Sequence, residues 1–311
     1  MGAPRPPAKF MPMQIEWRAG VSGSCFHAVG LLAAGKQPVI EGVAEALAGP
    51  TAAISAFLHR YAIPSEPIWR RLAATSISIE SNRDLARAVL QARVAREHLE
   101  HRVALLAGLI TDAELAYLRA FPNLLDELEL RSRPLREQWD AYGPGLLHSI
   151  GRRTDRGLVV DSARVALVQP FAGGGGAAFP EINTVAFEAV LANPSPRLPE
   201  VVRLAWLLST LGADLPDFTG LLGADRAREV VAAAMLPAVL AAASQDVEIV
   251  APADDLSAYA LQTWQVELPR ADAAVVIDRW FEFSRTRQTP WNVALKGLEG
   301  LLFDETEPTA D

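Results

Sequence analysis

LPEVVRLAWLLSTLG, residues 198 to 212, is the stretch that most constrains the fold of this chain. Its apolar side chains recur three and four positions apart, which predicts a helix with one buried face. Trp206 and Thr210 lie one turn apart on that helix, on the side away from the apolar stripe. The stripe consists of Val201, Leu204, Ala205, Leu208 and Leu211. We therefore expect an apolar helix with a tryptophan and a threonine on its second face.

The segments before this helix have the alternation of strands. Residues 157 to 171, GLVVDSARVALVQPF, and residues 183 to 194, NTVAFEAVLANP, are rich in valine and alternate in polarity. In the second segment Val185, Phe187 and Ala189 share one face. The glycine run between them, AGGGGAAFPEIN, lacks the lysine of a phosphate-binding loop. We predict a hairpin in which the glycine run is the loop.

The first 150 residues are predicted to be mainly helical, after a short strand within residues 11 to 20. The clearest helix covers residues 82 to 110, where Arg96 is the one stripe position that is not apolar. The next helical stretch contains Pro134 and Gly143-Pro144-Gly145, which predict a kink or a restart at each.

The chain after residue 212 is predicted to be helical again, with one more short strand over residues 246 to 252. We expect a loose arm over residues 1 to 11 and a disordered tail over 304 to 311. The sequence thus predicts a helix-rich α+β protein with a small antiparallel sheet near its middle. A helical part over residues 1 to 150 and an α+β part over 151 to 303 are expected to pack as one globular unit.

Composition argues against several classes of protein. The net charge of −8 disfavours a nucleic-acid-binding face, and the single cysteine excludes a disulfide within the chain. No secretory signal is visible at the N-terminus, and the longest apolar run, residues 230 to 243, is too short to span a bilayer. The only lysines are Lys9, Lys36 and Lys296, which with the abundant alanine is typical of GC-rich bacterial sequences. We expect a bacterial cytoplasmic protein without a membrane partner.

Cys25 is the one candidate nucleophile with a suggestive context. It follows Gly-Ser at the start of a predicted helix, whose amides lower a thiol pKa. The residues GSCF are similar to the signature of papain-like cysteine proteases, and His148 follows at about the expected distance. However, His148 lies in a predicted helix where that family uses a strand, and cysteine is commonly a buried packing residue. A hydrolase using Cys25 and His148 is therefore kept as an alternative.

The sequence assigns no metal site, cofactor or catalytic residue. Within EHLEH, His98 and His101 lie three positions apart, but the helix pattern directs Glu97 and His101 to solvent. A solvated helix face is the expectation there, since no second histidine pair completes a metal site. The chain also lacks G-x-S-x-G, Walker, C-x-x-C and H-E-x-x-H motifs.

The order helix, strand, glycine loop, strand, helix resembles the core of bacterial zinc metallopeptidases of the zincin superfamily. The helical leader over residues 25 to 50 is also similar, and the resemblance covers about residues 20 to 245. In that superfamily an edge strand binds the substrate and the next helix carries H-E-x-x-H. Here Trp206 and Thr210 stand at the histidine positions and Leu207 at the glutamate, while Glu229 near the third-ligand position cannot hold a metal alone. The resemblance implies a zincin-like, metal-free and non-catalytic protein.

Such a protein would use its former cleft or sheet edge to bind a peptide or protein partner. An extended segment would pair with residues 183 to 191, treated as an exposed edge strand. The binding residues expected from the resemblance are Trp206, Thr210, Asn183 and Phe187. A further alternative is a structural subunit, whose oligomer contact within residues 278 to 303 would be formed by Trp280, Phe281, Phe283 and Trp291. The oligomeric state stays open.

Overall fold

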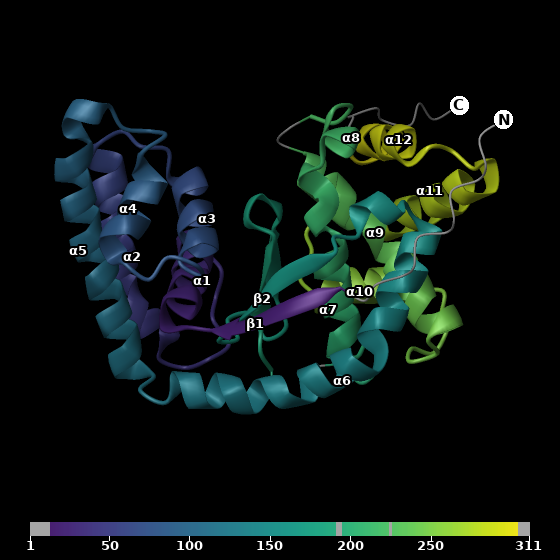
Figure 1. The fold of residues 1–311 in the computed structure, drawn as a ribbon, viewed down its shortest axis with the longest axis horizontal. Coiled ribbons are helices and arrows are strands. Elements are labelled where there is room, and N and C mark those ends of the chain that lie inside the picture. Colours follow the sequence, from purple (N-terminus) through teal and green to yellow (C-terminus); the bar gives the residue numbers. More distant parts are fainter. Residues whose placement is uncertain (1–12, 191–194, 224–225, 304–311) are drawn as a thin grey trace.

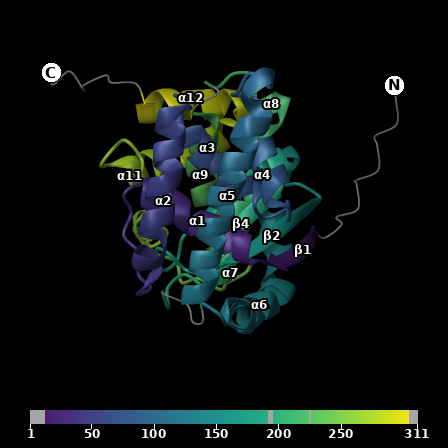
Figure 2. The same ribbon diagram turned by 90° about the vertical axis from the view of Figure 1, so that its left-hand side faces the viewer.

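The computed structural model describes residues 13–190, 195–223 and 226–303, so the predicted arm and tail lie outside the described residues. Two helical lobes flank a small sheet, and the long helix α6 (Leu124–Arg153) runs from one lobe to the other beneath it (Figure 1). Seen from the side of the first lobe, α2 and α5 lie in front and α6 is viewed nearly end-on (Figure 2). The sheet is therefore enclosed between two helical layers.

The first lobe contains five helices, and its clearest predicted helix is in fact two. The helices are α1 (Val21–Ala33), α2 (Val43–Arg60), α3 (Ser65–Thr75), α4 (Asn82–Leu90) and α5 (Arg96–Ala120). The Ser81 side chain accepts a hydrogen bond from the Asp84 amide at the start of α4, and Arg96 begins α5. Both helices bury their apolar stripe in the same core, so the residue spacing alone did not reveal the break at residues 91–95.

The α+β class is confirmed, and the sheet is mixed rather than antiparallel. Its strands are β1 (Gln14–Ala19), β2 (Ser162–Val168), β3 (Gly176–Phe179) and β4 (Thr184–Glu188), in the order β1-β2-β4-β3. β1 pairs parallel to β2 and β2 pairs parallel to β4, while β3 pairs antiparallel to β4. The predicted short strand before residue 20 is confirmed as β1.

The predicted hairpin is wrong, because it pairs β2 with β4 as antiparallel neighbours. β2 and β4 are parallel neighbours, and the antiparallel partner of β4 is β3, which the end of the glycine run forms. β4 consequently lies inside the sheet, and the strands at the sheet edges are β1 and β3. Alternation of polarity identifies a strand but not its direction, which is why the sequence could not decide this point.

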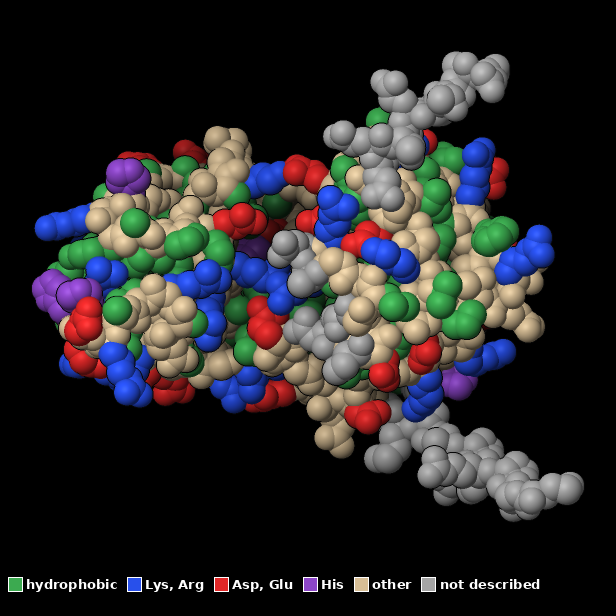
Figure 3. Space-filling view, turned by 90° about the horizontal axis from the view of Figure 1, so that it is seen from above, with side chains coloured by type: hydrophobic (Ala, Val, Ile, Leu, Met, Phe, Trp, Pro, Cys, Tyr) green, Lys and Arg blue, Asp and Glu red, His purple; other side chains and the backbone are tan. Residues whose placement is uncertain are grey.

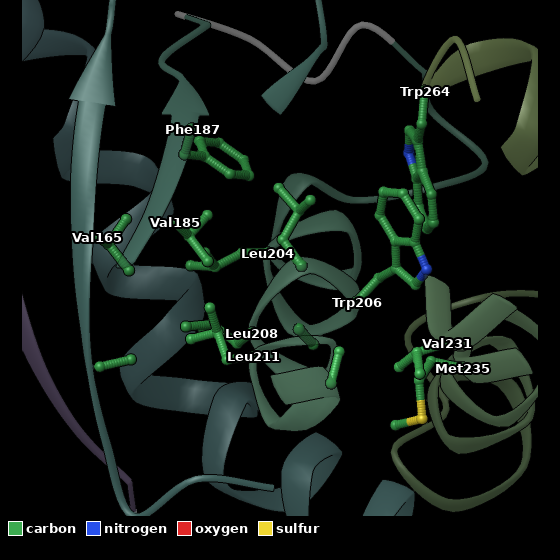
Figure 4. Close-up of a cluster of buried hydrophobic side chains, with 14 of the residues drawn as sticks. Val165, Val185, Phe187, Leu204, Trp206, Leu208, Leu211, Val231, Met235 and Trp264 are labelled. Atoms are coloured by element: carbon green, nitrogen blue, oxygen red, sulfur yellow. The ribbon is translucent and has the colours of Figure 1, made fainter. Parts of the chain in front are cut away.

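The helix from the opening stretch is α7 (Glu200–Ser209), and all ten of its residues are buried. Its Leu204 and Leu208, with Leu211 beyond its end, point toward the sheet residues Val185 and Phe187 (Figure 4). The opposite face of the sheet packs on the first lobe, where Phe179, Ala186 and Val168 of the sheet form a cluster with Ala74 of α3. Each face of the sheet thus belongs to a different lobe.

The second lobe is built around α9 (Ala227–Ala241). It also contains α8 (Pro216–Thr219), α10 (Leu256–Thr263), α11 (Ala273–Arg287), α12 (Trp291–Phe303) and the π-helical turn Ala242–Asp246. Short 3-10 turns are η1 (Arg156–Leu158), η2 (Pro180–Ile182) and η3 (Leu211–Asp214). The predicted strand over residues 246–252 is wrong, since the π turn and a loop occupy these positions.

Two helices differ in part from the sequence predictions. The stretch Ala227–Asp246 is long and apolar enough to cross a membrane, but 72% of its apolar window is buried inside the protein, as in a core helix. α6 continues through Pro134 and Pro144 without a restart, and it curves along its length (Figure 1). Gly143 leaves space for the Trp139 indole, because an added Cβ would lie 2.5 Å from that ring.

Candidate functional site

The four binding residues expected from the sequence do not share a cleft. The Trp206 ring lies against Trp264 with its nitrogen edge toward α9 (Figure 4), and its indole N–H donates to the Ala232 carbonyl at 2.9 Å. The Thr210 hydroxyl donates to the Leu207 carbonyl at the end of α7. Both side chains are buried, so this face of α7 packs against the second lobe.

Asn183 and Phe187 make contacts within the protein, at the start and in the interior of β4. Asn183 adopts a left-handed conformation (φ 49°) just before β4, and its side-chain amide donates to the Ser162 carbonyl. Phe187 lies on the α7 face of β4, and the Arg203 guanidinium sits 3.9 Å from its ring centroid. None of the four expected residues lines the cleft described next.

That cleft, here called the His27 cleft, lies between the two lobes and has a volume of about 430 Å³. α1 and α3 form one wall, and the glycine run with β3 forms the other. The surface is hollowed between the lobes, with basic and acidic side chains at the rim (Figure 3). The cleft is lined by His27, Leu31, Trp69, Phe179, Glu188 and Trp264, among others. Its charged lining also includes Lys36, Glu66 and Arg70.

Trp206 does not line the cleft, but it contacts a tryptophan that does. Its ring stacks on Trp264 with the centroids 5.2 Å apart and the planes inclined by 26°. Trp264 lines the cleft, so Trp206 supports the wall from behind.

Glu188 ends β4, and its side chain is completely buried. The carboxylate accepts hydrogen bonds from the backbone N–H groups of four consecutive residues, Ala172 to Gly175, at 3.0–3.2 Å. Gly173 (φ 82°) and Gly174 (φ 149°) have backbone conformations that residues with a side chain rarely adopt. The glycine run is therefore a backbone anion site, and the anion is a carboxylate of the same chain.

The environment keeps Glu188 ionised. Burial acts to raise the pKa of the Glu188 carboxyl, but the hydrogen bond and charge of His27 and the Ala172 and Gly174 amides outweigh it and bring the pKa to about 2. An ionised carboxylate is only an acceptor, so His27 must donate its Nε2–H across the 3.0 Å contact.

His27 lies on α1 with 7% of its surface exposed, and it lines the cleft. In the neutral form of His27, a proton on Nε2 that is donated to Glu188 leaves the lone pair on Nδ1. No hydrogen bond to Nδ1 is found in the part of the chain that the structure describes. The carboxylate thus fixes the tautomer of an imidazole whose second nitrogen can accept a proton or a hydrogen bond.

Arg203 of α7 binds the backbone of the glycine run and of β4 from the other side of the sheet. It is fully buried and donates to the carbonyls of Gly175 and Glu188 and to the Glu200 carboxylate. Burial lowers the pKa of Arg203 and raises that of Glu200, while their mutual attraction opposes both shifts. The opening helix therefore contributes to the site through Arg203, rather than through Trp206 or Thr210.

The outer edge of β3 opens onto the cleft. The Glu188 amide donates to the Gly175 carbonyl, so this pair is a hydrogen-bonded pair of the antiparallel ladder. Such pairs alternate with non-bonded ones, so Gly176 and Ala178 direct their N–H and C=O groups away from β4. Gly176 is exposed and lines the cleft.

The other candidates from the sequence lie elsewhere. Cys25 is buried in α1 and His148 is exposed on α6. Burial raises the pKa of the Cys25 thiol well above its usual range, which opposes formation of a nucleophilic thiolate. His98 and His101 are exposed on α5, as expected for a solvated face. Among the described residues, no three histidine, cysteine or acidic side chains gather as metal ligands would.

The aromatic residues considered for an oligomer contact are mostly internal. Trp280, Phe281 and Trp291 are buried, and the Trp280 indole donates to the Ala294 carbonyl. Phe283 is exposed to 62%.

Sequence reasoning missed both His27 and Glu188. A usable signal was present: a carboxylate at an alternate position of an otherwise apolar strand, 12 positions after the last residue of a glycine run. Comparison of the chain with protein-family models, curated proteins and solved structures found no match to any of them.

Proposed function

We propose that the His27 cleft binds an extended polypeptide segment of a partner protein, and that the segment pairs with the outer edge of β3. The observation that carries this proposal is the position of β3: an edge strand with two outward-facing residues that borders a cleft of about 430 Å³. Main-chain pairing with an exposed edge supplies affinity, and side-chain pockets supply specificity. The proposal moves the binding edge from β4, which is internal, to β3.

The walls of the cleft suit alternating side chains of such a segment. Residues of an added strand would point in turn to either face of the sheet. On the first-lobe face they would meet Trp69 of α3 and Leu31 of α1, with His27 at the floor. The cleft volume falls within the ~300–1,000 Å³ typical of ligand sites, which is room for a few side chains.

The zincin-like ancestry stays part of the proposal. It is supported by an antiparallel edge strand, β3, beside a buried helix, α7, that lacks the zinc ligands of that superfamily. A cytoplasmic location is proposed because the apolar stretch Ala227–Asp246 is mostly buried inside the protein, as in a core helix. A polypeptide rather than a nucleic-acid partner is proposed from the net charge of −8.

The test uses one substitution that removes a single outward N–H group. Dodecapeptides would be selected from a random displayed library on the full chain, and the affinity of the best binder measured by calorimetry. Ala178→Pro deletes the outward amide hydrogen of β3 while leaving the ladder to β4 intact, a position where edge strands accept proline. Ala178→Ser keeps the amide and serves as the matched control.

We expect Ala178→Pro to weaken binding about ten- to hundredfold, because one main-chain hydrogen bond is lost and a ligand carbonyl stays unpaired. Ala178→Ser should bind within about threefold of the wild type. Failure to select any binder, or equal affinity of the proline variant, would refute the pairing on β3.

A further inference from the structure

We propose that His27 is a general base, and that the His27 cleft hydrolyses an acyl bond in the segment bound along β3. This inference rests on the proposed binding site and assigns a reaction to it. The Cys25 and His148 pair considered from the sequence is not involved.

The first support is the fixed tautomer of His27. Glu188 is locked by four backbone N–H groups and cannot turn away, so it holds the imidazole through Nε2 at 3.0 Å. A carboxylate that orients a histidine in this way fixes its tautomer, so the neutral imidazole carries its lone pair on the opposite nitrogen. Tyr117 and Cys25 lie in the same buried region, but burial raises the pKa of both, so both stay neutral.

The second support is a backbone donor that lines the same cleft as His27. Gly175 gives its N–H to Glu188, and the following residue, Gly176, directs its N–H outward into the cleft. A carbonyl of a paired segment would accept a hydrogen bond from the Gly176 amide. That bond would polarise the carbonyl at the residue next to Gly175, whose own amide binds the Glu188 carboxylate.

The proposed step is balanced with water as the only co-reactant. His27 Nδ1 takes a proton from water while the water oxygen forms a bond to the acyl carbon and the carbonyl pair moves to its oxygen. When the carbonyl re-forms, the bond to the leaving group breaks, and the leaving group takes the proton from the imidazolium. The products are a carboxylic acid and an alcohol or amine, and the imidazole is restored.

The test follows release of 4-nitrophenolate from acetyl-trialanine 4-nitrophenyl ester. His27→Gln keeps an N–H that can donate to Glu188 but has no basic nitrogen, so the cleft should stay folded. His98→Gln removes an exposed histidine of α5 and is the matched control for unspecific esterase activity. His27→Ala, with and without added imidazole, tests the base independently of any effect of glutamine.

We expect His27→Gln to lower kcat at least about a hundredfold with KM within threefold, since general base catalysis contributes ~10²–10⁴. His98→Gln should leave both constants unchanged, imidazole should partly restore His27→Ala, and Ala178→Pro should raise KM. Equal rates for the wild type and His27→Gln would overturn the catalytic role. If the selected peptide still binds in that case, the binding site on β3 is supported and only the hydrolysis is refuted. Turnover that depends on His27 without any peptide binding would support the hydrolysis and refute the pairing on β3.

Discussion

His27 and Glu188 are 161 positions apart in the chain, and their side chains meet at 3.0 Å at the floor of the cleft. This contact joins α1 of the first lobe to β4 of the sheet. The same carboxylate accepts hydrogen bonds from the backbone amides of the glycine run. One side chain thus connects α1, β4 and the glycine loop.

Removing the charge of Glu188 should therefore destabilise the protein strongly. Glu188→Gln places an amide opposite backbone donors and loses the pair with His27, which we expect to cost about 3–5 kcal/mol of unfolding free energy. Glu181→Gln is the control, because its side chain is 38% exposed and its arginine pairs should contribute at most about 1 kcal/mol. Urea unfolding monitored by circular dichroism measures both. A loss below about 1 kcal/mol for Glu188→Gln would contradict the role of this carboxylate.

The stability of the protein should also fall on acidification in a defined range. The pKa of Glu188 is about 2 when folded, below its ordinary value of 4.5, so its contribution is complete above pH 4.5 and lost as the pH falls toward 2. The shift corresponds to roughly 3 kcal/mol. Unfolding midpoints measured from pH 6 to pH 2 should fall less steeply for Glu188→Gln than for the wild type. Parallel curves would show that Glu188 does not titrate as described.

Gly212, the last residue of the opening stretch, should not tolerate a side chain. An added Cβ would lie 2.4 Å from the Leu158 carbonyl oxygen, which requires the backbone to move. We expect Gly212→Ala to cost about 2–3 kcal/mol. Gly108→Ala in the exposed middle of α5 meets no atom within 4 Å and should stabilise by about 0.5–1 kcal/mol. Thermal unfolding of the two variants should thus shift in opposite directions.

Cys25 should not react with thiol reagents in the folded protein. The thiol is inaccessible, and burial raises its pKa well above the usual range. We expect no labelling by 5,5′-dithiobis(2-nitrobenzoic acid) under native conditions and about one equivalent in denaturant. Rapid native labelling would restore the cysteine nucleophile as a candidate.

The sequence predicted the elements better than their partners. The spacing of Leu204, Leu208 and Leu211 identified α7, and alternation identified β2 and β4. These patterns could not show that β4 lies between two other strands of the sheet, because strand order and direction depend on long-range pairing. Nor could they show that α6 continues through Pro134, since packing decides whether a helix bends or stops.

The site depended on information that no local pattern holds. The sequence does not single out His27 or Glu188, since nothing in it says that α1 lies against the end of β4. Trp206 was singled out because of its position on α7, but that face of the helix is covered by α9 (Figure 4).

Amide hydrogen exchange of β3, measured residue by residue with and without the selected peptide, tests the central claim most directly. Gly176 and Ala178 direct their N–H groups outward, whereas Ala177 and Phe179 already pair with β4. If a segment adds to this edge, exchange of the Gly176 and Ala178 amides should slow at least about tenfold at saturation, with little change at Ala177 and Phe179. Unchanged exchange at Gly176 and Ala178 in the presence of bound peptide would contradict the account.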